Sequence, residues 1–165
     1  MFRRWRANPG KQSSRGSGEG RSGQPGTVLV GISTDPRHDV ESGGTGLYEF
    51  WTTGGMPVYL HDTTLISMEL RPRDRKFVVR FEYSAPQWTP PAASQTPIVV
   101  MEFGEVTLLE WIQESGGGQD TPADINGQVS DFAHVSPNLF QLTTYQSDIS
   151  FTAASLTVTL RPREP

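Results

Sequence analysis

The chain has 165 residues, enough for one domain, and 35% of them are hydrophobic. It contains no cysteine, which excludes disulfide bridges, thiolate metal sites and a cysteine nucleophile. Its 14 basic and 18 acidic residues give a formal charge of −4 at pH 7, and apolar runs such as 98–101 are too short to cross a bilayer.

The first 26 residues are mostly Gly, Ser, Arg, Gln and Pro, and such a segment buries too little apolar surface to offset its ordering entropy. It begins with basic residues that no apolar segment follows, so no export signal is completed and we expect a cytoplasmic protein. The segment has six basic residues and one acidic residue, Glu19, so it could bind the phosphates of a nucleic acid weakly. A solvated tail is the simpler interpretation.

Residues 27–55 are interrupted by Gly or Pro every few positions. The runs TVLVGIS and LYEFW are open to two interpretations, as short edge strands or as part of a loose leader. Translation starts either at Met1 or at Met56, which directly precedes the first regular pattern. We therefore assign residues 1–55 to a disordered or misannotated leader and residues 56–165 to a folded domain.

The most regular pattern lies between residues 59 and 83, on both sides of the run RPRDRK. Apolar and polar residues alternate along both flanks, which predicts two half-buried antiparallel strands. Pro72 and Asp74 between them are typical of a turn. The side chains expected to face the core are Ile66, Met68, Leu70, Phe77, Val79, Phe81 and Tyr83.

Four prolines between residues 84 and 97 exclude a helix and predict a stiff connection that carries Trp88. Trp88 either covers the core or is an exposed aromatic side chain for a sugar or peptide. The run PIVVMEFGEV then predicts a central strand with a bulge or bend at Gly104. Residues 106–111 are expected to form strand rather than helix, and residues 115–128 a surface loop.

Three short strands are predicted near the end of the chain, at NLFQLTT, SDISFTA and SLTVTLRP, with a turn over residues 145–148. Their expected inward side chains are Phe140, Leu142, Ile149, Phe151, Leu156, Val158 and Leu160. The predicted fold is all-β, a single antiparallel β domain arranged as a sandwich or a half-open barrel.

Catalytic and metal-binding patterns are weak. The three histidines, His38, His61 and His134, share no metal-ligand spacing, so we expect no metal and no cofactor. His61 and Asp62 resemble a base with its orienting group, but no nucleophile motif accompanies them, and Asp62 is more simply a turn residue. Sheet carboxylates that meet in space, as in glycoside hydrolases, remain an alternative.

The charges are unevenly distributed. Between Arg80 and Arg161 the chain has nine carboxylates and no lysine or arginine. This predicts an acidic surface that attracts a basic protein, unless the charge serves only solubility. The residues expected to contact that partner are Glu102, Glu105, Glu110, Glu114, Asp120 and Asp124, with Trp88 as an exposed aromatic.

Several motifs follow one another in a recognisable order over about residues 57–160. His61 and Asp62 open a strand, an apolar strand ends at Tyr83 with Trp88 soon after, and a final F-x-L precedes I-x-F-x-A-x-x-L-x-V. This order resembles the immunity protein 50 family of bacterial polymorphic toxin systems. The resemblance implies a small cytoplasmic β-protein that binds and neutralises a cognate toxin without catalysis, and it transfers no binding residue. The alternative is a β module that binds a small ligand or carbohydrate.

Overall fold

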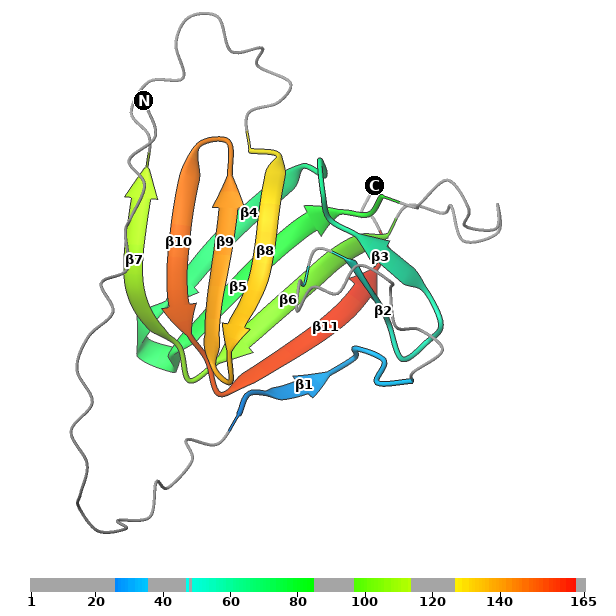
Figure 1. Ribbon diagram of the computed structural model, residues 1–165, viewed down its shortest axis with the longest axis horizontal. Helices are drawn as coiled ribbons and strands as arrows, with labels where there is room; N and C mark the ends of the chain where they lie inside the picture. Colours follow the sequence, from blue (N-terminus) through cyan, green and yellow to red (C-terminus); the bar gives the residue numbers. More distant parts are fainter. Residues whose placement is uncertain (1–25, 36–46, 48, 85–96, 114–126, 163–165) are drawn as a thin grey trace, which may run out of the picture.

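The computed structural model describes residues 26–35, 47, 49–84, 97–113 and 127–162 (Figure 1). Within these ranges the regular elements are strands and one short 3-10 turn, and no helix is long and apolar enough to cross a membrane. The elements are β1 (Val28–Val30), β2 (Glu49–Trp51), β3 (Pro57–Tyr59), β4 (Leu65–Arg71), η2 (Pro72–Asp74), β5 (Lys76–Glu82), β6 (Ile98–Gly104), β7 (Thr107–Gln113), β8 (Val129–Ser136), β9 (Leu139–Thr144), β10 (Ser147–Thr152) and β11 (Ser155–Arg161).

The strands form three sheets. The first has five strands in the order β1-β11-β6-β5-β4, the second has four in the order β7-β10-β9-β8, and the third pairs β2 with β3. Every named pairing is antiparallel except that of β1 with β11, which is parallel. The predicted all-β class with antiparallel sheets is therefore confirmed.

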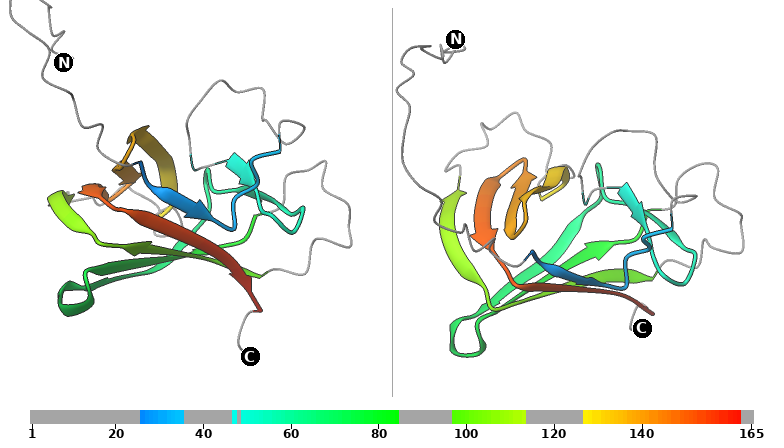
Figure 2. Two further views of the ribbon diagram at one scale, coloured as in Figure 1. Left: turned by 90° about the horizontal axis from the view of Figure 1, so that it is seen from below. Right: turned by 60° about the horizontal axis from the view of Figure 1, so that its bottom comes forward.

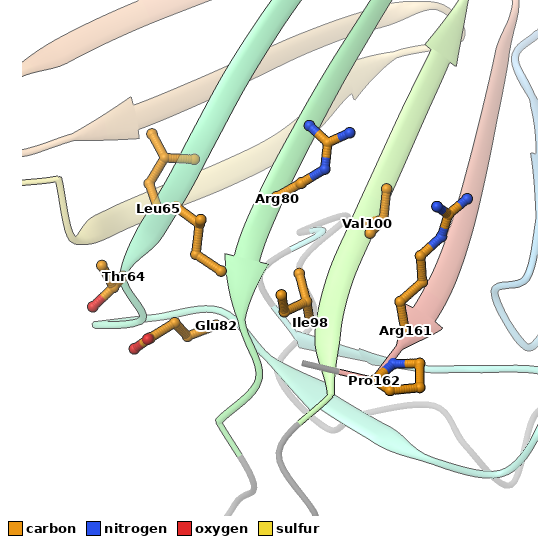
Figure 3. A pocket seen from close by; sticks show the side chains of 9 residues that line it. Thr64, Leu65, Arg80, Glu82, Ile98, Val100, Arg161 and Pro162 are labelled. Atoms are coloured by element: carbon orange, nitrogen blue, oxygen red, sulfur yellow. The ribbon is translucent and has the colours of Figure 1, made fainter. Parts of the chain in front are cut away.

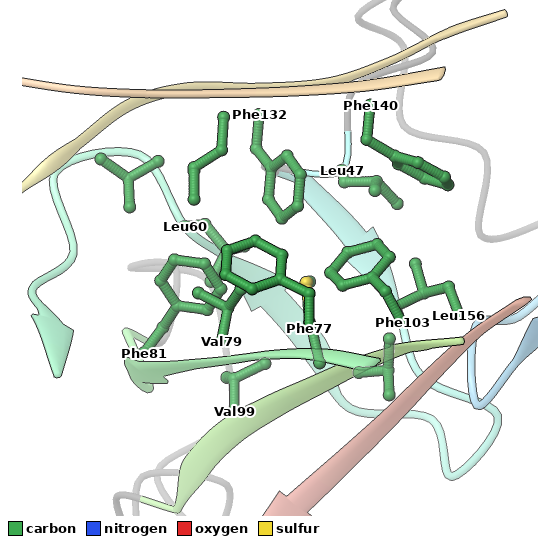
Figure 4. Close-up of a cluster of buried hydrophobic side chains, with 14 of the residues drawn as sticks. Leu47, Leu60, Phe77, Val79, Phe81, Val99, Phe103, Phe132, Phe140 and Leu156 are labelled. Carbon is green, nitrogen blue, oxygen red and sulfur yellow. The ribbon is translucent and has the colours of Figure 1, made fainter. Parts of the chain in front are cut away.

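The five-stranded and four-stranded sheets lie over one another as two layers (Figure 2). Phenylalanine side chains from both layers fill the space between them (Figure 4). The six fully buried ones are Phe77, Phe81, Phe103, Phe132, Phe140 and Phe151. The first three come from the five-stranded sheet and the others from the four-stranded sheet, so each layer contributes half of this aromatic core.

The two layers are joined at one side. Thr64, just before β4, forms a β-bridge with Gln128, just before β8. The amide of Asp62 donates to the carbonyl of Val129 at 2.9 Å, and the amide of Val129 donates to the carbonyl of Thr63 at 3.0 Å. β7 lies at the opposite edge of the four-stranded sheet, and no described β-bridge connects it to the five-stranded sheet. The arrangement is a half-open barrel that is open along β7.

The leader boundary expected at residue 56 needs correction, because described residues before it belong to the domain. β1 pairs with β11, β2 pairs with β3, and Leu47 and Phe50 are only 5% and 7% exposed within the core. β1 continues into Gly31, which has a φ of 87° and whose added Cβ would lie 2.1 Å from the carbonyl oxygen of Val158. Glycine at position 31 permits this close packing. Residues 1–25 and 36–46 lie outside the described residues.

The predicted hairpin is present as β4 and β5, with one error of register. Phe77, Val79, Phe81 and Tyr83 are buried as predicted, and Met68 packs against the core. β4 contains an irregularity between Leu65 and Ser67, so Leu65 packs against the core. Leu70 lies opposite the buried Phe77 and so on the inward side as predicted, although it is 36% exposed. Ile66, which was also expected to face inward, is 43% exposed on the outer side. An extra residue in a strand shifts the alternation by one position.

Most of the later elements match the prediction. β6 is central in its sheet, residues 107–113 form strand β7, and the three predicted closing strands are β9, β10 and β11. Gly104 ends β6 at the corner that leads to β7. β8 was not predicted.

Candidate functional site

Two of the predicted contact carboxylates are paired with cations of the β4–β5 hairpin. The carboxylate of Glu102 in β6 contacts the ammonium of Lys76 in β5. Oε2 of Glu105, in the turn after β6, lies 2.6 Å from Nη1 of Arg75. Because the pairing of β5 with β6 brings these cations alongside, the negative charge of both carboxylates is compensated.

The third described carboxylate, Glu110, lies in β7, in the other sheet. It is opposite Ser150 of β10, while Asp131 of β8 and Asp148 of β10 both lie opposite Thr143 of β9. Their neighbours Phe132 and Ile149 point into the core, so these carboxylates are on the outer side of the four-stranded sheet. We call Glu110, Asp131 and Asp148 the acidic sheet face.

No cation offsets the acidic sheet face within its own sheet, because β7, β8, β9 and β10 contain no lysine or arginine. Among the described residues, none of its three carboxylates takes part in a salt bridge. Asp131 and Asp148 belong to the nine carboxylates between Arg80 and Arg161 but were not among the predicted contact residues. Glu114, Asp120, Asp124 and Trp88 lie outside the described residues.

β7 is the most exposed strand of the sheet that carries this face. All seven of its residues are exposed. Four of them are large and apolar, and their exposed fractions are 38% for Leu108, 57% for Leu109, 44% for Trp111 and 48% for Ile112. Single exposed apolar side chains are ordinary, but a contiguous group marks an interaction surface.

The register of β7 shows which of these side chains lie over the core. Trp111 is opposite Ile149 and Leu108 is opposite Phe151, and both partners are fully buried between the layers. Trp111 and Leu108 therefore lie on the core side of the sheet. Their exposure shows that the five-stranded sheet does not cover β7, so the core surface of the four-stranded sheet continues into solvent at its edge.

β7 differs from the edge strand β1 in its length and from the edge strand β4 in its small number of charges. β1 is also apolar and exposed but only three residues long. β4 carries charges on its exposed edge, where Nε and Nη2 of Arg71 donate to the carboxylate of Glu69 at 2.7 and 2.8 Å. β7 has one charge, Glu110, and a bulge in which Leu109 has no partner on β10. Charges and bulges limit unspecific pairing of edge strands, so β7 is protected only lightly.

The side chains of His61 and Asp62 contact each other at the entrance to β4. Nδ1 of His61 lies 3.0 Å from Oδ2 of Asp62, and both side chains are about half exposed. Asp62 has a φ of 60°, as expected for a turn residue. The neighbouring Thr63 hydroxyl donates to the carbonyl of Leu60 at 2.7 Å. No group of three potential metal ligands occurs in the described part of the chain, and His38 lies outside it.

Glu82 and Glu102 are spaced too widely for a glycoside-hydrolase pair, and Glu69 and Glu102, which both flank Val78, are each paired with a cation. Glu82 is opposite Ile98, and Glu102 is opposite Val78, so the two positions are four residues apart along the paired strands. At about 3.4 Å per residue this is about 14 Å between backbones, whereas catalytic carboxyl pairs are about 5 to 9.5 Å apart.

A groove of about 690 Å³ lies on the outer face of the five-stranded sheet (Figure 3). Its lining residues are Thr64, Leu65, Ile66, Arg80, Glu82, Ile98, Val100, Arg161 and Pro162. Nη1 of Arg80 lies 3.3 Å from the hydroxyl of Ser67 and 3.8 Å from Oε2 of Glu69. Hydrogen bonds from Arg71 to Glu69 lower the pKa of that carboxyl, and the nearby charge of Arg80 lowers it further. The described residues of the lining include no aromatic ring on which a sugar would stack.

No protein-family model matches the chain, and comparisons with curated proteins and with solved structures also find no match. The resemblance to immunity protein 50 therefore stays a prediction.

Proposed function

We propose that this chain is a non-catalytic protein-binding domain that holds a basic partner protein at β7 and the acidic sheet face. The observation that carries the proposal is the exposure of Leu108 and Trp111 on the core side of the sheet. Apolar area of this kind is favourably removed from water at about 25 cal/mol per Å². A partner that covers β7 would complete the open side of the barrel.

The specific form of this function is neutralisation of a toxin in the cytoplasm, which the motif order supports. A toxin that acts on nucleic acid presents cations where phosphates bind. The carboxylates Glu110, Asp131 and Asp148, which form no salt bridge with another described residue, offer a complementary charge pattern for such a surface. The acidic sheet face is then part of the recognition surface and speeds association at low salt.

Site-specific photo-crosslinking tests the binding surface. A photoreactive amino acid at Ile112 of β7 is compared with the same group at Leu70, which is similarly exposed but in the five-stranded sheet. We expect a discrete adduct with a basic protein from position 112 and none from position 70. The purified partner should then bind the Ile112→Lys variant much more weakly. Equal adducts from both positions, or unchanged affinity of this variant, would refute the proposal.

Neutralisation is tested separately by co-expression with the basic partner that the crosslink from position 112 captures. Growth should be restored by the unchanged chain and by Leu70→Lys, but not by Ile112→Lys. Rescue by all three would place the neutralising surface elsewhere.

A second candidate function is binding of a small ligand in the outer groove, which the alternative from the sequence also predicts. Its apolar floor and the guanidinium groups of Arg80 and Arg161 suit an amphiphilic carboxylate rather than a neutral sugar. Calorimetric titration with octanoate, repeated with Arg161→Ala, tests it. Heat that is unchanged in this variant would exclude the groove.

A further inference from the structure

We propose that the partner adds an extended segment to β7 as a further strand of the four-stranded sheet, with a lysine or arginine opposite Glu110. This rests on the proposed function and names how the same site recognises its partner. The added segment would have apolar residues on the side of Trp111 and Leu108 and its basic residue on the opposite side.

The backbone of β7 supplies the first part of the match. Among the described strands, which have the order β7-β10-β9-β8 in this sheet, β7 is paired on one side only. Alternate residues of an edge strand direct their N–H and C=O groups away from the neighbouring strand, and another extended chain can pair with them. With seven residues, β7 is long enough for a strand of ordinary length to pair with it.

The side chains of β7 supply the second part. Trp111 and Leu108 lie on the core side and need apolar neighbours, whereas Glu110 lies on the outer side. Directly opposite positions on paired strands have Cβ atoms about 4.5–5.5 Å apart, so a lysine or arginine opposite Glu110 reaches its carboxylate. Asp148, one strand further in, adds negative potential on the same side. The preferred segment therefore alternates apolar and basic or polar residues.

A second copy of this chain fits β7 less well. Symmetric antiparallel pairing centred on Glu110 places two carboxylates opposite each other, which is destabilising. Moving the centre to Trp111 places Glu110 opposite Ile112, on the same outer side, and leaves it without a cation. A different protein with a basic segment is the better occupant.

Synthetic peptides test the strand addition. The probe is a short fluorescein-labelled peptide in which valine alternates with lysine and threonine, and binding is followed by anisotropy. A second peptide has the same side chains but is N-methylated at alternate residues. A third is N-methylated at the other set of alternate residues. In a fourth, glutamate replaces lysine. Strand addition predicts that one methylated set binds at least tenfold more weakly, because it loses its hydrogen bonds to β7.

Charge exchange tests the contact at Glu110. In Glu110→Lys the lysine peptide should bind about threefold to tenfold more weakly and the glutamate peptide more tightly, as expected for a cross-strand ion pair that becomes a repulsion. Asp74→Lys in η2 has the same change in net charge but lies at the tip of the β4–β5 hairpin, and both peptides should bind it as they bind the unchanged chain. Thermal unfolding of both variants checks that they are folded.

Three results would overturn strand addition. Equal affinity of all methylated peptides would mean packing against side chains only. Absence of peptide binding, or equal effects of Glu110→Lys and Asp74→Lys, would remove the basic strand as the ligand. Concentration-dependent dimers that Ile112→Lys dissociates would make a second copy the occupant. Each of these leaves the crosslink from position 112 as an independent test of the proposed function.

Discussion

The rings of Phe103 and Phe151 meet edge to face with their centroids 4.8 Å apart, one from each of the two main sheets. Phe103 also contacts Phe140 edge to face at 5.1 Å and lies 6.0 Å from Phe132. Edge-to-face pairs contribute about 0.5–1.5 kcal/mol beyond the area that they bury. Phe103 therefore joins the five-stranded sheet to three aromatic rings of the four-stranded sheet.

Replacement of Phe103 by alanine should lower the free energy of unfolding by about 3–5 kcal/mol, because it leaves a cavity between the layers. In a double-mutant cycle with Phe151→Ala, the two losses should be non-additive by about 0.5 kcal/mol or more. Urea unfolding measures both. Ser67→Ala, on the outer side of the sheet, serves as control. Additive losses would show that the two rings do not interact.

The described residues before position 56 should stabilise the domain. A chain that begins at residue 56 lacks Leu47 and Phe50, each of which contributes about 1.5–3 kcal/mol when buried. We expect it to be less stable than a chain that begins at residue 26 by at least about 3 kcal/mol. Gly31→Ala tests the docking of β1 within the longer chain, since its Cβ would meet the backbone of Val158. Equal thermal midpoints of the two chains would restore the boundary at residue 56.

Tyr83 should make stability fall at alkaline pH. Its hydroxyl donates to the carbonyl of Pro57 at 2.7 Å, and burial raises its pKa above the usual 10.0. Above about pH 10 the unfolded state loses a proton that the folded state keeps, so the free energy of unfolding decreases as pH rises. Tyr83→Phe should lose about 0.5–1.5 kcal/mol near pH 7 but show a smaller alkaline decrease. Tyr145→Phe, an exposed position, should change neither in urea unfolding.

His134 should tolerate replacement by phenylalanine. Its ring is parallel to that of Phe140, with centroids 4.5 Å apart and an angle of 4°. Its Nε2 atom is buried and has no hydrogen-bond partner in the described structure. His134→Phe keeps the stacking and removes the unsatisfied nitrogen, so stability should stay equal or rise by about 1 kcal/mol. A loss of more than about 1 kcal/mol in thermal unfolding would mean that Nε2 has a partner. His61→Phe is the exposed control.

Alternation identified the strands whose two faces differ in polarity. The patterns around Phe77 and Ile149 predicted both the strands and their inward sides. Alternation is uninformative where both faces are buried, and Val78 shows this. It lies on the outer side of β5 but is only 2% exposed, with Glu69 and Glu102 as cross-strand neighbours. The aliphatic stems of such residues cover apolar surface while their charges stay in water.

The absence of lysine and arginine between Arg80 and Arg161 did not by itself show which carboxylates of that segment share a surface. Strand pairing brings Lys76 beside Glu102 from outside that interval, while Glu110 stays with Asp131 and Asp148 in a sheet without cations. The sequence does not show which carboxylates lie beside a cation until the register of the strands is known. The exposure of the β7 side chains could not be predicted from the sequence either, because their apolar pattern alone fits a buried strand.

The parallel pair β1 and β11 joins segments from opposite ends of the described chain, and the Thr27 hydroxyl next to β1 donates to the carbonyl of Ala153, 126 residues away. During synthesis on a ribosome β1 emerges early and has no sheet edge to join until β11 has been made. Until then the backbone groups of Val28, Leu29 and Val30 that will pair with β11 are open to chaperones or to other nascent chains. Contacts between such distant segments also slow folding. The last step of folding should therefore be the docking of β1, completed only after β11 has left the ribosome.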